Sequence, residues 1–92
     1  MSLEDRLLAI LACPIDKRGL LYFGDEAILY NPRLRRIYRV VDGRPVMLAD
    51  RAERAGEPEH RRLIERASTG QATGTAGMVA ELLDEATRDS WL

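Results

Sequence analysis

The chain is poor in the residues that build metal and nucleophilic sites. Its 92 residues include one cysteine, Cys13, and one histidine, His60. One cysteine excludes an internal disulfide, and these two residues alone are too few ligands for a tetrahedral zinc site. A Cys–His nucleophilic pair would have to use both of them, whereas a lone cysteine more often serves as a small buried apolar residue. The composition argues against most enzyme classes and favours a reducing, cytoplasmic setting.

An excess of one charge and long apolar runs are also missing. Lys and Arg total 14 against 15 Asp and Glu, which gives a net charge of −1 and no overall positive field for nucleic acid. The longest apolar run, residues 7–13, is far shorter than the roughly 20 residues of a membrane span. Because Glu4 and Asp5 precede this run, it does not resemble a signal peptide. We expect a soluble chain that makes no membrane contact.

Apolar residues are concentrated in the first half, which holds 27 of the 42. Leucines at positions 3, 7, 8 and 11 have helical spacing, and Pro14 ends that helix. Turns are predicted at Gly24–Asp25, with a positive φ at the glycine, and at Asp42–Gly43. Short strands are predicted at Leu20–Phe23, Ala27–Tyr30, Arg36–Val41 and Val46–Leu48. This order predicts an α+β fold in which an N-terminal helix precedes an antiparallel sheet of three to four short strands.

The second half has fewer apolar residues and reads as three attachments to a core of residues 1–50. Residues 51–69 are expected to form a helical extension, because Pro58 suits a first helical turn. Residues 70–77 are rich in glycine and threonine and predict a flexible linker. Residues 78–92 predict an amphipathic C-terminal helix. Such a helix packs on its own domain, across a homodimer, or on a partner.

Two stretches of the core resemble one known family. Residues 8–16 read Leu-Ala-Ile-Leu-Ala-Cys-Pro-Ile-Asp, and residues 38–48 read Tyr-Arg-Val-Val-Asp-Gly-Arg-Pro-Val-Met-Leu. Together they resemble the small bacterial YcaR-like proteins, relatives of the Trm-one-twelve-like zinc-ribbon activator subunits of tRNA and protein methyltransferases. The resemblance covers about residues 3–50 and implies a zinc-ribbon-like core. Residues 51–92 match nothing in the family pattern.

The chain departs from the family at the zinc ligands. The four family cysteines fall on Cys13 and Asp16, here named the first knuckle, and on Tyr30 and Arg33, the second knuckle. Tyrosine is a poor zinc ligand and a protonated arginine cannot be one, so a metal-free ribbon is expected. Asp16 and Arg33 are expected to form an exposed ion pair across the knuckles, which stabilises little. Apolar burial would then replace the ion, and the residues expected to supply it are Cys13, Ile15, Leu20, Ile28 and Ile37.

The resemblance implies a non-catalytic protein that activates or stabilises a SAM-dependent methyltransferase. Its partner would contact the segment that closes the family pattern, where an exposed strand edge at residues 37–41 could accept a strand of the enzyme. The contact residues implied in this way are Ile37, Arg39, Val41, Asp42, Gly43, Arg44, Pro45 and Met47.

Two alternatives remain open. The C-terminal helix could close a homodimer without any methyltransferase. A cluster of arginines could contact RNA phosphates: Arg33, Arg35, Arg36 and Arg39. Only five aromatic residues are present and none forms a base-stacking platform, so direct nucleic-acid binding is the weaker of the two alternatives.

Overall fold

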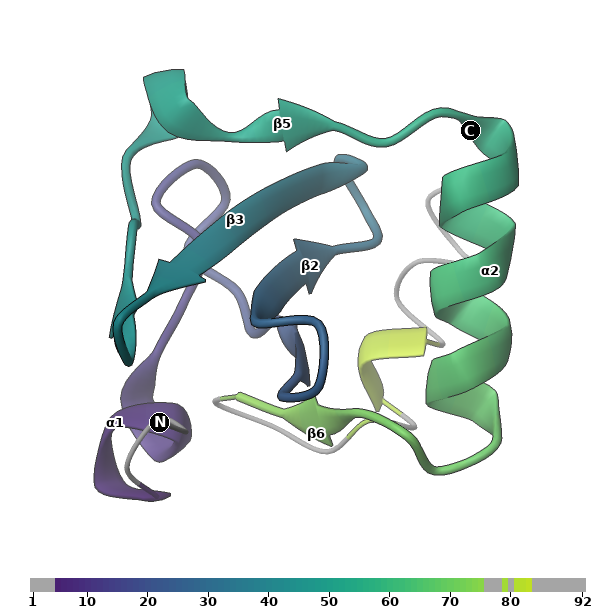
Figure 1. The fold of residues 1–92 in the computed structure, drawn as a ribbon, viewed down its shortest axis with the longest axis horizontal. Coiled ribbons are helices and arrows are strands. Elements are labelled where there is room, and N and C mark those ends of the chain that lie inside the picture. Colours follow the sequence, from purple (N-terminus) through teal and green to yellow (C-terminus); the bar gives the residue numbers. More distant parts are fainter. Residues whose placement is uncertain (1–4, 76–78, 80, 84–92) are drawn as a thin grey trace.

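A small antiparallel sheet organises the molecule, and two helices flank it (Figure 1). The computed structural model describes residues 5–75, 79 and 81–83. The helical elements are α1 (Asp5–Ile10), a 3-10 turn η1 (Ala49–Arg51) and α2 (Glu57–Ser68). The strands are β1 (Leu21–Phe23), β2 (Ile28–Asn31), β3 (Arg36–Val41), β4 (Arg44–Pro45), β5 (Glu53–Arg54) and β6 (Thr73–Gly74). The α+β class expected from the sequence is confirmed.

All three central strands are paired on both edges. The sheet order is β4-β3-β2-β1-β6, and β5 also pairs with β3. The outer edge of β3 is therefore shared, with Val40 opposite Pro45 of β4 and Ile37 opposite Glu53 of β5. At the other end of the sheet, β6 covers the outer edge of β1. The edges that strand addition would need on these central strands are thus already occupied by the chain itself.

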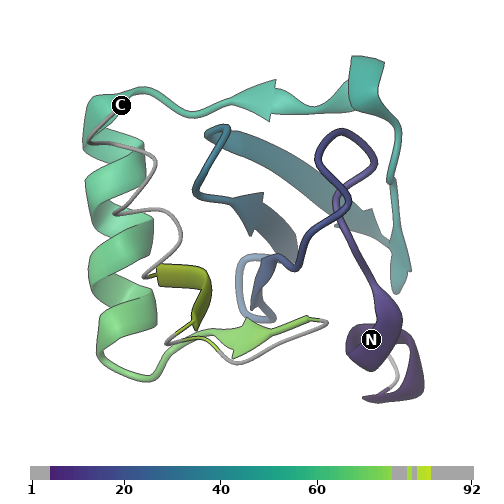
Figure 2. The same cartoon turned by 180° about the vertical axis from the view of Figure 1, so that it is seen from behind.

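The side chains of the strands alternate between two packed faces of the sheet. On the first face, Tyr22, Leu29 and Tyr38 pack in one apolar cluster with Leu8 and Leu11 from the α1 region. The second face packs against α2, which buries Leu63 and Ala67 on it. The strand residues of the second face are Leu21, Phe23, Ile28, Tyr30 and Ile37. Figure 2 shows the same arrangement from behind, with α2 along one side of the sheet and α1 toward the other.

The predicted strand at Val46–Leu48 is wrong, because β4 lies at Arg44–Pro45. Asp42 and Gly43 both have positive φ, 52° and 75°, as a two-residue hairpin turn of type I′ requires. A turn this tight places residue 44 directly opposite Val41, so pairing begins earlier than the apolar pattern suggests. After Val46, whose amide donates to the Arg39 carbonyl at 2.9 Å, the chain leaves toward η1 and β5.

Two local predictions in the core are also corrected. The turn after β1 is longer than a Gly24–Asp25 hairpin, and its left-handed residue is Ala27, with φ 54°, not Gly24. Ile15 is 46% exposed because it lies in the knuckle turn, outside both clusters. The other residues predicted to replace the ion, Cys13, Leu20, Ile28 and Ile37, are all buried.

The segment expected to be a flexible linker is partly a strand. Thr73 and Gly74 pair with Tyr22 and Leu21 of β1, and the next residue, Thr75, is fully buried. Beyond it, residues 79 and 81–83 are helical, and Leu82 joins the second-face cluster at 3% exposure. The rest of the predicted 78–92 helix lies outside the described residues. Within the described ranges, no helix is both long and apolar enough to cross a bilayer.

Candidate functional site

The two knuckles are tight turns that place Asp16 near Arg33. The first closes through backbone bonds, with the Lys17 amide donating to the Cys13 carbonyl at 2.9 Å and the Cys13 amide to the Arg18 carbonyl at 2.8 Å. The second is organised by Asn31, whose side-chain oxygen accepts from the amides of Arg33 (2.9 Å) and Leu34 (3.1 Å). An Asx turn of this kind follows from asparagine at the end of a strand. Each turn is therefore closed by hydrogen bonds between residues of the turn itself or directly beside it.

Arg33 connects the two knuckles. Its Nε lies 2.8 Å from Asp16 Oδ2 and its Nη2 lies 3.2 Å from Asp16 Oδ1, a two-pronged contact. The same Nη2 donates to the Gly19 carbonyl at 2.8 Å. The ion pair predicted between these residues is present, but the prediction that it is exposed is wrong. The Arg33 side chain is 1% exposed and that of Asp16 is 21% exposed.

The environment of Asp16 favours its charged form. Burial would raise the pKa of the carboxyl, but hydrogen bonds from Arg33, Asn31 and the Arg18 amide together outweigh that effect and lower it to about 2. Two of these donors belong to the second knuckle, and the Arg18 amide belongs to the first. The carboxylate is therefore a structural anion that ties two turns together.

Cys13 and Tyr30, the other two ligand positions, point to opposite faces of the sheet. Cys13 is buried in the first-face cluster, where its Sγ lies 3.2 Å from the Tyr38 hydroxyl. Tyr30 belongs to the second-face cluster, and its hydroxyl shares a 2.5 Å hydrogen bond with Nδ1 of His60 on α2. The four positions thus do not surround one point. No group of three or more His, Cys, Asp and Glu residues suited to a metal occurs in the described part of the chain.

His60 and Tyr30 form a partly buried polar pair beneath the start of α2. Burial lowers the pKa of His60, and the nearby positive charge of Arg35 lowers it further. Burial also raises the pKa of Tyr30. Both groups are therefore held neutral, which suits a hydrogen bond that fastens α2 to the sheet. Sequence reasoning named His60 only as a potential nucleophile partner of Cys13, whose side chain packs on the other face.

The arginines considered for RNA contact do not form one strip. Arg33 is buried against Asp16, whereas Arg35 pairs with Glu57 and Arg39 with Glu53. Arg36 donates to the Leu34 carbonyl at 3.1 Å. Three of the four charges are thus matched by carboxylates. No local sequence pattern indicates these pairs, because each of the three carboxylates comes from outside the arginine-rich segment.

The residues implied as partner contacts separate into buried and exposed groups. Ile37 is 7% exposed and lies in the second-face cluster, so it is not available on the surface. The predicted free strand edge at residues 37–41 is wrong, because β4 and β5 pair with it. The hairpin itself is exposed. Val41, Asp42, Arg44 and Val46 line an open hollow of about 490 Å³.

Apolar exposure accompanies this hollow. Val41 is 54% exposed and Leu48, two residues after Val46, is 55% exposed. Gly43, Pro45 and Met47 are half-buried, and Met47 packs against the first-face cluster. We name the residues Val41, Asp42, Arg44, Val46 and Leu48 the hairpin surface. Of these residues, Val41, Asp42 and Arg44 belong to the predicted contact set, whereas Val46 and Leu48 lie outside it. Arg39, also in that set, is exposed and pairs with Glu53.

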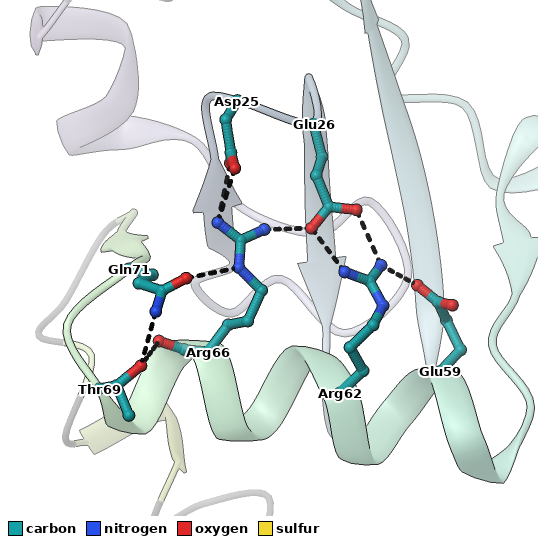
Figure 3. A network of polar contacts seen from close by, with 7 residues as sticks. All are labelled: Asp25, Glu26, Glu59, Arg62, Arg66, Thr69 and Gln71. Carbon is teal, nitrogen blue, oxygen red and sulfur yellow. Dashed lines mark hydrogen bonds and ion pairs between the residues drawn. The ribbon is translucent and has the colours of Figure 1, made fainter.

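An ion-pair network that sequence reasoning missed fastens α2 to the β1–β2 turn (Figure 3). Arg66 contacts Asp25 and Glu26, and Arg62 contacts Glu26 and Glu59. The Arg66 guanidinium also lies 5.0 Å from the centre of the Phe23 ring. A signal was present, since Arg62 and Arg66 are one helical turn apart on the same side of α2.

Comparison with known proteins places the core in a family. The model of the Trm112p-like proteins matches residues 4–43. A UPF0434 protein of Coxiella burnetii is 48% identical over 48 residues, which are 52% of this chain and 86% of that protein. A UPF0434 protein of Gluconobacter oxydans is 37% identical over 51 residues, 55% of this chain and 86% of that protein.

A solved structure agrees with these matches. The solution NMR structure of an uncharacterised structural-genomics target is 48% identical, with a TM-score of 0.52, and the match covers 61% of this chain and 92% of that one. These relatives are nearly fully covered while a large share of this chain is not, so most of the C-terminal part has no counterpart in them. The chain belongs to the UPF0434 group of Trm112p-like proteins.

Proposed function

We propose that this protein is a non-catalytic binding subunit that stabilises or activates a SAM-dependent methyltransferase. The observation that carries the proposal is the hairpin surface, where Val41, at 54% exposure, lines an open hollow and Leu48, at 55% exposure, follows two residues after the last lining residue, Val46. Exposed apolar residues that gather at one place are typical of protein contact sites. The class of partner is proposed from the resemblance to methyltransferase activator subunits.

The polar groups of the site support binding more than catalysis. Asp16 is held by Arg33, and the Tyr30–His60 pair lies between the sheet and α2. Neither arrangement is among the residues that line the hollow, which are Val41, Asp42, Arg44 and Val46. The protein would then act by covering an apolar patch of the enzyme and stabilising the active conformation of that enzyme.

The mode of contact differs from strand addition at β3. Since β4 and β5 occupy the outer edge of β3, a partner would contact the side chains of the hairpin surface and not the main-chain groups of β3. Val41 and Leu48 would enter an apolar recess of the enzyme, and Asp42 and Arg44 would make polar contacts at its rim. Specificity would then depend on side chains.

Affinity capture from native lysate tests the proposal. The full-length chain is expected to recover a SAM-dependent methyltransferase, and the double variant Val41→Asp/Leu48→Asp is expected to lose it. Leu34→Asp is the matched control, because Leu34 is an exposed apolar residue, at 37% exposure, on the turn before β3. The control variant should capture the enzyme as well as the unmodified chain does.

Two outcomes would contradict the proposal. One is capture in which no methyltransferase is enriched over a mock bait. The other is capture that Leu34→Asp reduces as much as the double variant does, because the hairpin surface would then have no special part in it. Circular dichroism of each variant establishes that the fold is retained before capture is compared.

A further inference from the structure

The outer edge of β1 is closed by residues that lie more than 50 positions further along the chain. Leu21 pairs with Gly74, and Tyr22 pairs with Thr73. Thr75 extends this contact, since its amide donates to the Leu20 carbonyl at 2.9 Å and its hydroxyl accepts from the Leu20 amide at 2.7 Å. Thr75 is fully buried. A backbone and one hydroxyl together satisfy both polar groups of Leu20.

Gly19 allows the Thr75 backbone to lie this close to the segment that leads into β1. A Cβ built on Gly19 would lie 2.1 Å from the Thr75 carbonyl oxygen and 3.0 Å from a methyl group of Leu82. Gly19 is not among the described residues that have a positive φ, so the backbone conformation at this position does not itself require glycine. The absence of a side chain at Gly19 leaves room for the Thr75 carbonyl and the Leu82 side chain. The outer edge of β1 therefore accommodates an extended strand, and the closest approach between the two segments is at Gly19.

The matches with relatives cover the β1 side of this contact more fully than the β6 side. The match to the NMR relative covers 92% of that chain and 61% of this one, and the family model ends at residue 43, before β6. In this chain the core supplies β1 and Gly19, and the added part supplies β6, Thr75 and Leu82. The two halves of the contact are therefore separable in principle, as a binding site and its ligand are.

We propose that the outer edge of β1 is a strand-docking site, filled in cis by residues 73–75, and that the same residues of a second copy can fill it in trans. The product would be a strand-exchanged dimer in which each copy closes the sheet of the other. The cis ladder contains only two residue pairs, so little pairing must be lost during exchange. The turn at Gly70 has φ +82° and an open surrounding, which allows the path of the chain to change there. This inference does not depend on the methyltransferase proposal.

The first test shortens the turn in the full chain. Deleting Gln71 and Ala72 removes about 7 Å of reach, so that Thr73 cannot return to β1 of its own chain. Light scattering is expected to show a dimer for this variant and a monomer for the unmodified chain at the same low concentration. Hydrogen exchange should show the Leu20 amide still protected in the dimer. A folded monomer with a freely exchanging Leu20 amide would overturn the proposal.

The second test supplies the segment separately to the full chain that carries the Gln71–Ala72 deletion. A labelled peptide of residues 70–83 is added at low chain concentration, and binding is followed by anisotropy. Saturable binding supports the proposal. Gly19→Ala in the same deletion variant is the matched control and should weaken binding at least tenfold. No binding at millimolar peptide, or equal binding by the control, would overturn it.

Discussion

Arg33 Nε lies 2.8 Å from Asp16 Oδ2, at two positions where the family pattern has zinc-binding cysteines. The contact joins the same two turns that a metal would join, and Arg33 is 1% exposed while doing so. A buried ion pair is not in itself strongly stabilising, because both charges lose their hydration. Hydrogen bonds from Asn31 and to the Gly19 carbonyl satisfy the remaining polar groups of this pair.

Replacing Arg33 alone should destabilise the protein markedly. Arg33→Met leaves the Asp16 carboxylate partly buried without its main partner, and we expect the free energy of unfolding to fall by about 2–4 kcal/mol. Urea denaturation followed by circular dichroism measures this. The double variant Arg33→Met/Asp16→Asn should recover part of the loss, because it removes the uncompensated charge. A loss below about 0.5 kcal/mol in the single variant would contradict a structural part for this pair.

The Asp16–Arg33 contact should also make the free energy of unfolding depend on pH in the acid range. The pKa of Asp16 is about 2 in the folded chain and 3.8 ordinarily, so folding favours the charged carboxylate. Its contribution is therefore present above about pH 4 and is lost as the pH falls toward 2. Urea midpoints measured from pH 6 to pH 2 should fall steeply over this window. Asp16→Asn should have a shallower slope there; equal slopes would show that other carboxyl groups dominate.

Removal of metal should have no effect on stability. Arginine at one ligand position, and a tyrosine turned toward the other face of the sheet, leave too few donors for a structural zinc ion. The melting temperature is expected to be the same with and without EDTA. Elemental analysis of the purified protein provides the complement. Stoichiometric zinc, or a drop in melting temperature on chelation, would contradict the metal-free ribbon.

Two arginines on α2 should differ sharply in their importance. Arg66 contacts Asp25, Glu26 and the Phe23 ring, whereas Arg61 is 77% exposed and pairs with Glu57 on its own helix. We expect Arg66→Ala to lower the melting temperature by several degrees and Arg61→Ala to leave it nearly unchanged. The Arg66 effect should shrink in high salt, since part of it is screened. Equal effects of the two variants would mean that the network does not hold α2.

Much of the core could be predicted from the sequence because its signals are local. β3 spans Arg36–Val41 as expected, since β-branched and aromatic residues at those positions favour a strand. The Asp42–Gly43 turn is likewise set by two residues that tolerate positive φ. Val46–Leu48 shows the limit of such signals. An apolar triplet looks like a strand, but the tight turn before it had already fixed where pairing begins and ends.

The candidate site was predictable in its chemistry but not in its burial. The residue types at the knuckles were enough to expect an ion pair between Asp16 and Arg33. Its near-complete burial depends on how both turns pack against Gly19 and Asn31, which composition does not reveal. The same holds for Tyr30, whose direction is decided by strand alternation and by the arrival of His60 from α2.

The sequence by itself determined several local features of this protein: the helix before Pro14, the strand at Arg36–Val41, the Asp42–Gly43 turn and the residue types at the knuckles. Each depends on residues close together in the chain, where backbone preferences and spacing are sufficient. Only the tertiary structure decided how the sheet is closed. Thr75 reaches Leu20 across 55 positions, and β5 closes the edge of β3 that seemed free. Closures of this kind depend on the packing of distant segments, which no local pattern encodes.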